Sequence, residues 1–101
     1  MLTIQTKQAK TLWQKIVGLI GSNAVTPLFL QTRFGIHTFG MKQPIDVIIL
    51  EKETVVDIQE NIQPNRIFFW NPHYSDVLEL PAGTIQKLHI KPGTTVAIEI
   101  L

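Results

Sequence analysis

The chain has 101 residues, of which 45% are hydrophobic and 17% charged, and nine Lys and Arg against eight Asp and Glu give a formal charge of +1. This length suits a single domain over residues 1–101, and the high apolar content with a small net charge argues against disorder. The cations are spread along the chain without a basic cluster, which argues against a nucleic-acid module. Cysteine is absent, so the chain has no disulfide, thiolate metal site or cysteine nucleophile.

The sequence shows neither an export signal nor a membrane span. Residues 1–5 lack a basic region followed by a long apolar stretch, and no apolar run exceeds four residues. We therefore expect a cytoplasmic protein, although a chain from which an export segment had been removed would have the same pattern.

The first twenty residues change from the period of a strand to that of a helix. Alternation of Leu2, Ile4 and Thr6 with polar residues predicts a short strand. From Lys7 onward the apolar positions follow one helix face: Ala9, Leu12, Trp13, Ile16, Val17 and Ile20. With Thr6 as N-cap and a stop at residues 21–23, the pattern predicts an amphipathic helix, and such an apolar stripe usually packs on the core of a small domain.

The rest of the chain is typical of β structure. We expect strands at residues 28–30, 33–39, 45–50, 54–58, 77–80 and 96–100, with a hairpin turn at 51–53 and a loop at 64–72. Residues 91–94 have Pro and Gly at the central positions of a type II turn, and residues 84–90 fit either a helical turn or a strand. The predicted fold class is mainly β (α+β): a small curved sheet or barrel-like β domain with one N-terminal amphipathic helix packed on it.

Two separated runs in the β-rich part have the order of a family signature. The first run has two parts, Gly35-Ile36-His37-Thr38-Phe39-Gly40-Met41 and then Pro44-Ile45-Asp46-Val47-Ile48-Ile49-Leu50. The second run is Val77-Leu78-Glu79-Leu80-Pro81-Ala82-Gly83. With Pro64-Asn65-Arg66 between them as a proline-centred loop, these runs resemble the family called domain of unknown function 192. The chain departs from the family pattern at three loop positions: Lys42-Gln43, Glu51–Thr54 and Gly93-Thr94. The resemblance implies a compact, mainly β fold in a small prokaryotic protein, and it implies no activity.

Asp46 stands in an aliphatic strand, on a face that it shares with aliphatic side chains. A carboxylate buried there without a partner would cost several kcal/mol, so it needs one, and Arg33, His37 and Arg66 are available. One interpretation is a buried ion pair or a backbone-bonded aspartate that fixes strand register. The other is that Asp46 forms one wall of a polar pocket.

Arg33, Gly35 and His37 would share one face if that stretch were extended. Gly35 would then leave a gap between two polar groups, in which Arg33 could bind a ligand carboxylate or phosphate. The alternative is that Gly35 is a bulge or a close-packing glycine. Glu79 faces away from its two leucine neighbours and is most simply an exposed carboxylate at a sheet edge.

The aromatic segment Phe68-Phe69-Trp70 is followed by Asn71-Pro72-His73-Tyr74. Consecutive side chains of a strand point to opposite faces, so either a second layer covers the outward ring or that ring is an exposed contact site. Phe69, Trp70 and Tyr74 are therefore a candidate interaction surface, with Trp70 as the anchor if it is exposed.

Three functions stay open. The leading hypothesis is a non-catalytic binding or accessory domain whose polar pocket takes an anionic ligand or peptide group through Arg33, His37, Asp46, Arg66 and Glu79. The second is a small hydrolase or metal-dependent enzyme using His37, Asp46 and Glu79, although the chain has no His-x-His, Gly-x-Ser-x-Gly or glycine-rich phosphate motif. The third is a protein-interaction module that works through residues 68–74. No cofactor and no metal is predicted, and the oligomeric state is not indicated.

Overall fold

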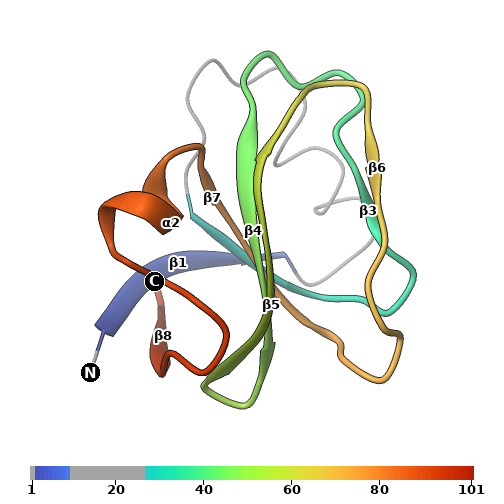
Figure 1. Cartoon of the computed structure of the whole chain (residues 1–101). Coiled ribbons are helices and arrows are strands. Elements are labelled where there is room, and N and C mark those ends of the chain that lie inside the picture. Colours follow the sequence, from blue (N-terminus) through green and yellow to red (C-terminus); the bar gives the residue numbers. More distant parts are fainter. Residues whose placement is uncertain (1, 10–26) are drawn as a thin grey trace.

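A computed structural model describes residues 2–9 and 27–101 of the chain (Figure 1). The elements, in chain order, are β1 (Leu2–Ala9), β2 (Leu28–Gln31), β3 (Ile36–His37), β4 (Ile45–Glu51), β5 (Thr54–Ile62), β6 (Ile67–Phe68), β7 (Asp76–Pro81), α2 (Thr84–Lys87) and β8 (Val96–Ile100). Across these residues no helix combines the length and the apolar character needed to cross a membrane.

Six strands form one curled sheet in the order β5-β4-β7-β2-β1-β8, and β3 and β6 form a separate two-stranded ribbon. β1 runs parallel to both of its neighbours, β2 and β8, whereas the other neighbouring strands are antiparallel. The sheet curls until its outer strands meet at one end, where Thr54 pairs with Thr95 and the Val55 amide donates to the Thr94 carbonyl at 2.9 Å. The result is a half-barrel, which confirms the prediction of a mainly β, curved sheet.

Each face of the sheet carries its own apolar cluster, because both faces are covered. The cluster on the side of α2 consists of Ile4, Ile48, Leu50, Val55, Leu78, Leu80, Ile85, Ile90 and Val96. The cluster on the side of the ribbon consists of Leu28, Leu30, Ile36, Met41, Ile45, Val47, Ile49, Ile62, Trp70 and Val77. β4 lies between the two clusters with residues 45–50 all buried, which explains why aliphatic residues stand on both of its faces.

Most of the predicted strands are confirmed. Those expected at 28–30, 45–50, 54–58, 77–80 and 96–100 correspond to β2, β4, β5, β7 and β8, and β5 continues to Ile62. The undecided residues 84–90 contain the short helix α2. In the predicted turn at 91–94, the Thr94 amide donates to the Lys91 carbonyl at 2.9 Å, and Gly93 has the positive φ of 95° that such a turn requires.

The predicted N-terminal helix is wrong where the structure describes it. Residues 7–9 do not begin a helix but continue β1, pairing in register with residues 28–30 of β2. This segment is therefore a strand because it pairs with β2, although its apolar residues have the spacing of a helix. The remainder of the predicted helix, residues 10–20, lies outside the described residues.

Candidate functional site

Asp46 is fully buried, and its carboxylate is bonded to backbone amides rather than to a cation. Oδ1 accepts a hydrogen bond from the Asn61 amide and Oδ2 accepts one from the Ile85 amide, each at 2.9 Å. Asn61 has a φ of 54° and lies where β5 has one extra residue relative to β4, and Ile85 is in the first turn of α2. Asp46 therefore joins the sheet, the bulge and the helix, and no arginine of the described residues pairs with it.

Glu79 is also fully buried, so the exposed edge position expected for it is wrong. It lies on β7 between β4 and β2, where its register partners are Val47 and Leu28. Neither carboxyl oxygen has a hydrogen-bond partner among the described residues. Burial raises the pKa of the Glu79 carboxyl from its ordinary value of 4.5 to about 8, so the group is mostly protonated at neutral pH.

The two buried carboxyl groups point to opposite faces of the sheet. Asp46 shares the side of α2 with Ile48, whereas Glu79 shares the side of the ribbon with Val77. Across β4 and β7, Asp46 is paired with Leu80 and not with Glu79. The geometry therefore does not bring the Asp46 and Glu79 side chains together as an acid and a base. Within the described part of the chain there is also no group of three His, Cys, Asp or Glu that could hold a metal ion.

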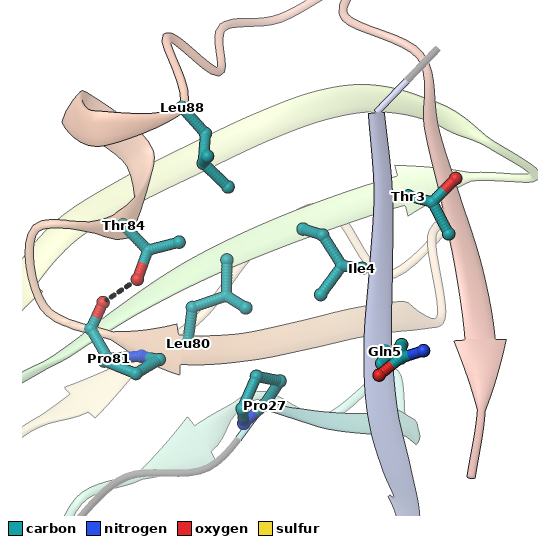
Figure 2. A pocket seen from close by; sticks show the side chains of 8 residues that line it. All are labelled: Thr3, Ile4, Gln5, Pro27, Leu80, Pro81, Thr84 and Leu88. Carbon is teal, nitrogen blue, oxygen red and sulfur yellow. Dashed lines mark hydrogen bonds between the residues drawn. The ribbon is translucent and has the colours of Figure 1, made fainter.

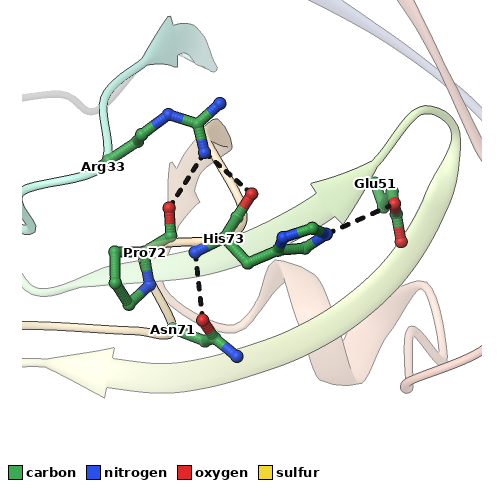
Figure 3. Close-up of polar contacts among 5 residues, drawn as sticks. All are labelled: Arg33, Glu51, Asn71, Pro72 and His73. Carbon is green, nitrogen blue, oxygen red and sulfur yellow. Dashed lines mark hydrogen bonds and ion pairs between the residues drawn. The ribbon is translucent and has the colours of Figure 1, made fainter.

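Arg33 lies in the turn between β2 and β3, where it ties two loops together (Figure 3). Its Nη1 donates to the carbonyls of Pro72 and His73, at 2.9 and 2.8 Å. In the same turn the Thr32 amide donates to the Ser75 carbonyl at 2.9 Å. Arg33 is thus held by the loop at 71–75, far along the sequence, and it does not line a pocket with Asp46.

Gly35 shows why residues 33–39 are not one extended stretch. Its φ of 87° breaks the strand, so that only Ile36 and His37 form β3, and the shared face expected for Arg33, Gly35 and His37 is wrong. A Cβ atom built on Gly35 would lie 2.6 Å from Cδ1 of Phe69 and 2.8 Å from the carbonyl oxygen of Phe68. Gly35 is the close-packing glycine of the alternative interpretation, and the ring of Phe69 fills the space beside it.

His37 and Arg66 lie on the ribbon, near one another in its register. His37 pairs with Ile67, the residue after Arg66. The His37 ring stacks on Phe39 with ring centroids 5.1 Å apart, and its Nδ1 accepts from the Phe39 amide at 3.3 Å. The exposed Arg66 guanidinium donates to the neighbouring Asn65 carbonyl at 3.4 Å. The structure therefore places Arg33, His37 and Arg66 on the ribbon and its adjoining turn, and leaves Asp46 and Glu79 inside the sheet.

The two faces of the ribbon differ in exposure. Ile36 and Phe68 are paired on the inner face, where they pack on the core, and His37 and Ile67 are paired on the outer face. Four large apolar side chains are exposed on the ribbon segments or in the turns that flank β3: Phe34 (87% exposed), Phe69 (67%), Ile67 (56%) and Phe39 (46%). These four residues are called the ribbon surface below.

Trp70 is not the exposed anchor that the sequence suggested. It is buried against the core, and its Nε1 donates to the Tyr74 carbonyl at 2.9 Å, while Tyr74 itself is half-buried. The predicted alternation is confirmed, but the outward ring is that of Phe69. The same alternation would have identified Ile67, whose position has the parity of Phe69, as a further outward residue.

Phe34 and Phe39 were missed because no periodicity covers a turn. Their only signal in the sequence is a large aromatic next to a glycine, in Phe34-Gly35 and in Phe39-Gly40. Such a pair indicates a turn, in which neither helix nor strand periodicity predicts whether the aromatic side chain is buried.

A groove of about 560 Å³ opens between β1 and the chain around α2 (Figure 2). It is lined by Thr3, Ile4, Gln5, Pro27, Leu80, Pro81, Thr84 and Leu88. None of these side chains is ionisable, and the Thr84 hydroxyl donates to the Pro81 carbonyl at 2.6 Å. The described lining of the groove therefore offers neither a general base nor a charged group, and it contains none of the predicted site residues.

Comparison with known proteins supports the fold and the family. No curated protein sequence matches the chain. A candidate transcription regulator from Sinorhizobium meliloti 1021 is 21% identical, with a TM-score of 0.74 over 89% of this chain and 78% of that one. A protein of unknown function from Novosphingobium aromaticivorans DSM 12444 is also 21% identical, with a TM-score of 0.77 over 89% of this chain and 71% of that one. At this identity the likeness shows the fold alone. The pattern of the domain of unknown function 192 family, described as Uncharacterized ACR, matches residues 1–98, and the chain therefore belongs to that family.

Proposed function

We propose that the protein is a non-catalytic binding domain that holds an apolar segment of a partner protein on its ribbon surface. The observation that carries this proposal is the exposure of Ile67 and Phe69 on a ribbon whose inner side is packed on the core, together with Phe34 and Phe39, which are exposed in the turns on either side of β3. Grouped exposed aromatics are typical of protein interfaces, where they bury a large area at a small cost in side-chain entropy.

The charges around the ribbon surface support a partner that is acidic as well as apolar. Residues 31–45 and 61–75 contain Arg33, Lys42 and Arg66 and no Asp or Glu. The rest of the chain then has six Lys and Arg, nine less these three, against all eight acidic residues, a formal charge of −2. The two segments that carry the apolar surface are thus cationic in sequence, and a carboxylate-bearing partner would be attracted to them.

A protein partner fits these residues better than a lipid surface. Each Lys or Arg that lies near an anionic membrane surface contributes roughly 1 kcal/mol to binding, and proteins that recognise anionic lipid use clusters of about four to eight such residues. The two ribbon segments have three. Two of them are arginines, which together with aromatic residues are enriched at protein interfaces.

The test is a selection of random peptides on the folded protein, followed by affinity measurements with the enriched peptides. Replacement of Phe34 by Ser should lower their affinity by about tenfold or more, because an exposed anchor ring is removed. The melting temperature should stay within a few degrees of the wild type, because Phe34 is 87% exposed. Leu101→Ser is the matched control, since Leu101 is 74% exposed but lies at the far end of β8, and it should leave the affinities unchanged.

Three results would contradict the proposal. Peptides that bind the Phe34→Ser variant as well as the wild type would place the binding site elsewhere. Vesicles of phosphatidylserine and phosphatidylcholine that bind the wild type, when no peptide is enriched, would assign the surface to a membrane. A wild-type dimer in sedimentation that Phe34→Ser dissociates would assign it to a second copy of the chain.

A further inference from the structure

The guanidinium of Arg33 is fixed beside the ribbon surface by one of its three nitrogens. Nη1 donates to two carbonyls, those of Pro72 and His73. Arg33 directly precedes Phe34, the most exposed residue of the ribbon surface, and the Phe34 amide is bonded to the Thr32 hydroxyl at 3.3 Å within the same turn. The Arg33 guanidinium and the exposed Phe34 ring therefore project from the same hydrogen-bonded turn.

The loop that supplies the two carbonyls is itself held in place. The His73 amide donates to Oδ1 of Asn71 at 3.0 Å, and the Tyr74 amide donates to the Asn71 carbonyl at 3.0 Å. The buried indole of Trp70 donates to the Tyr74 carbonyl. A side chain anchored to such a loop loses little further freedom when it binds a partner, which favours affinity.

The other two nitrogens of Arg33, Nε and Nη2, donate to no group of the described residues. In Figure 3 the second terminal nitrogen points away from the loop that holds the first. Nε and Nη2 form the side-on fork of a guanidinium, whose two parallel N–H bonds match the two oxygens of a carboxylate. Arg33 is thus bonded on one side and presents an unused fork on the other.

No carboxylate of the ribbon region competes for this fork. Residues 31–45 and 61–75 contain neither Asp nor Glu. The acidic side chains that adjoin the region contact other residues of it and not Arg33: Glu51 pairs with His73 at 3.9 Å, and Asp76 accepts from Gln31 at 3.0 Å. A fixed cation with a free bidentate face is what a partner carboxylate would recognise.

We propose that the partner segment carries a carboxylate next to its apolar side chain, and that Arg33 binds this carboxylate through Nε and Nη2. This inference rests on the proposed function and specifies the chemistry of its partner. A phosphate is the less suitable anion, because its three oxygens and higher charge are usually bound by several cations. Here a single guanidinium is available, and its Nη1 already donates to the loop carbonyls. Arg33 would set specificity, while the ribbon surface supplies the apolar contact.

The test is a double-mutant cycle with the peptides enriched in the selection described above. These peptides should contain Asp or Glu beside an aromatic or aliphatic residue. Changing that acid to its amide should lower affinity for the wild type by about tenfold to a hundredfold, and should have little further effect on the Arg33→Gln variant. Arg66→Gln is the matched control, since Arg66 is an exposed arginine of the same ribbon, and it should change the affinity less than threefold.

The outcomes separate this inference from the proposed function. If acidic and amide peptides bind the wild type equally while Phe34→Ser abolishes binding of both, the carboxylate is not recognised and the binding surface stands. If the acid couples to Arg66 instead, or if a phosphoserine peptide binds more tightly than the acidic one, the assignment to Arg33 and a carboxylate is overturned. If no peptide is enriched, both proposals fail.

Should Arg33→Gln not fold, because its two carbonyl contacts are lost, the peptide substitution on the wild-type protein still decides the matter. The Arg33→Lys variant provides a second test of the same proposal. It keeps the charge but offers no planar fork, and it should bind the acidic peptide several-fold more weakly than the wild type.

Discussion

Asp46 and Glu79 show how differently two buried carboxyl groups can be accommodated in one sheet. Asp46 accepts hydrogen bonds from two backbone amides, so that each of its oxygens has a partner. Glu79 faces the apolar cluster on the ribbon side, and no group of the described residues donates to it. The first carboxyl group is a structural acceptor, and the second is a neutral acid under ordinary conditions.

The protonation of Glu79 makes stability depend on pH. Its folded pKa of about 8 lies above the ordinary value of 4.5, so between these values the native protein binds more protons than the unfolded chain. The contribution of Glu79 is therefore complete below pH 4.5 and is lost as the pH rises toward 8. Glu79→Gln should remove this dependence, so that the wild type loses on the order of a few kcal/mol relative to the variant between these limits.

Urea unfolding of both proteins at a series of pH values measures this difference directly. Comparing wild type with Glu79→Gln cancels the titration of the histidines and the other carboxylates, which both proteins share. Parallel stability curves for the two proteins would show that Glu79 is charged or solvated in the native state.

Asp46 should be among the residues whose loss costs most. Asp46→Ala leaves the Asn61 and Ile85 amides without their acceptor, and we expect a loss of about 2 to 5 kcal/mol in the free energy of unfolding. Asp57→Ala is a suitable control, because Asp57 is exposed on β5 and its side chain bonds, among the described residues, only to the amide of its neighbour Ile58. This variant should change stability by about 0.5 kcal/mol or less. Chemical denaturation of the two variants checks this, and equal losses would contradict the role assigned to Asp46.

At the scale of elements, the ribbon depends on a glycine that both bends the chain and admits a ring. Gly35→Ala should destabilise the protein by about 2 to 4 kcal/mol. The alanine backbone would be held at a positive φ that strains it, and the new methyl group would also meet Phe69 and the Phe68 carbonyl. Gly83→Ala separates the two effects. Gly83 has a similar φ of 92° but nothing within 4 Å of the added Cβ, so only the backbone cost of about 1 to 2 kcal/mol applies.

Thermal or urea unfolding of these two variants gives the comparison. Equal losses would mean that the ribbon yields around the new methyl group, and that Phe69 is not held against Gly35.

The elements that the sequence predicts well are those whose residues are governed by burial alone. β4 and β7 have aliphatic runs because both of their faces are covered, and such runs are recognisable without any partner. The segment at 7–9 and the stretch at 33–39 are governed by distant contacts instead. The first pairs with β2, and the second is bent where the ring of Phe69 meets Gly35, so neither conformation could be read from local spacing.

The candidate site was predictable to the same limited degree. That Asp46 needs a partner follows from its aliphatic neighbours, but its actual partners are backbone amides, which every residue except proline has and which no sequence pattern distinguishes. The burial of Glu79 depends on β7 having neighbours on both sides, which is a property of strand order. Arg33, His37 and Arg66 were identified as polar candidates, but the ribbon that gathers them arises from the pairing of β3 with β6.

For the whole molecule, the charge distribution and the shape agree with one another. The cations of residues 31–45 and 61–75 accompany the ribbon, while most carboxylates lie outside these segments, as in the Glu53, Asp57 and Glu60 series on and just before β5. In Figure 1 the ribbon lies on the opposite side of the molecule from α2 and β8. An acidic partner approaching at low salt would therefore be turned toward the ribbon before contact, and this orientation effect would weaken as ionic strength rises.

The position of β1 between β2 and β8 has a consequence for how the protein is made. Leu2 to Thr6 pair with Val96 to Ile100, so β1 must wait until β8 has been synthesised before its second edge is bonded. During synthesis that edge is open to other strands, including those of neighbouring nascent chains. Completion of the half-barrel thus requires β8, and a product cut before Val96 would leave β1 with one neighbour and Val96 missing from the core.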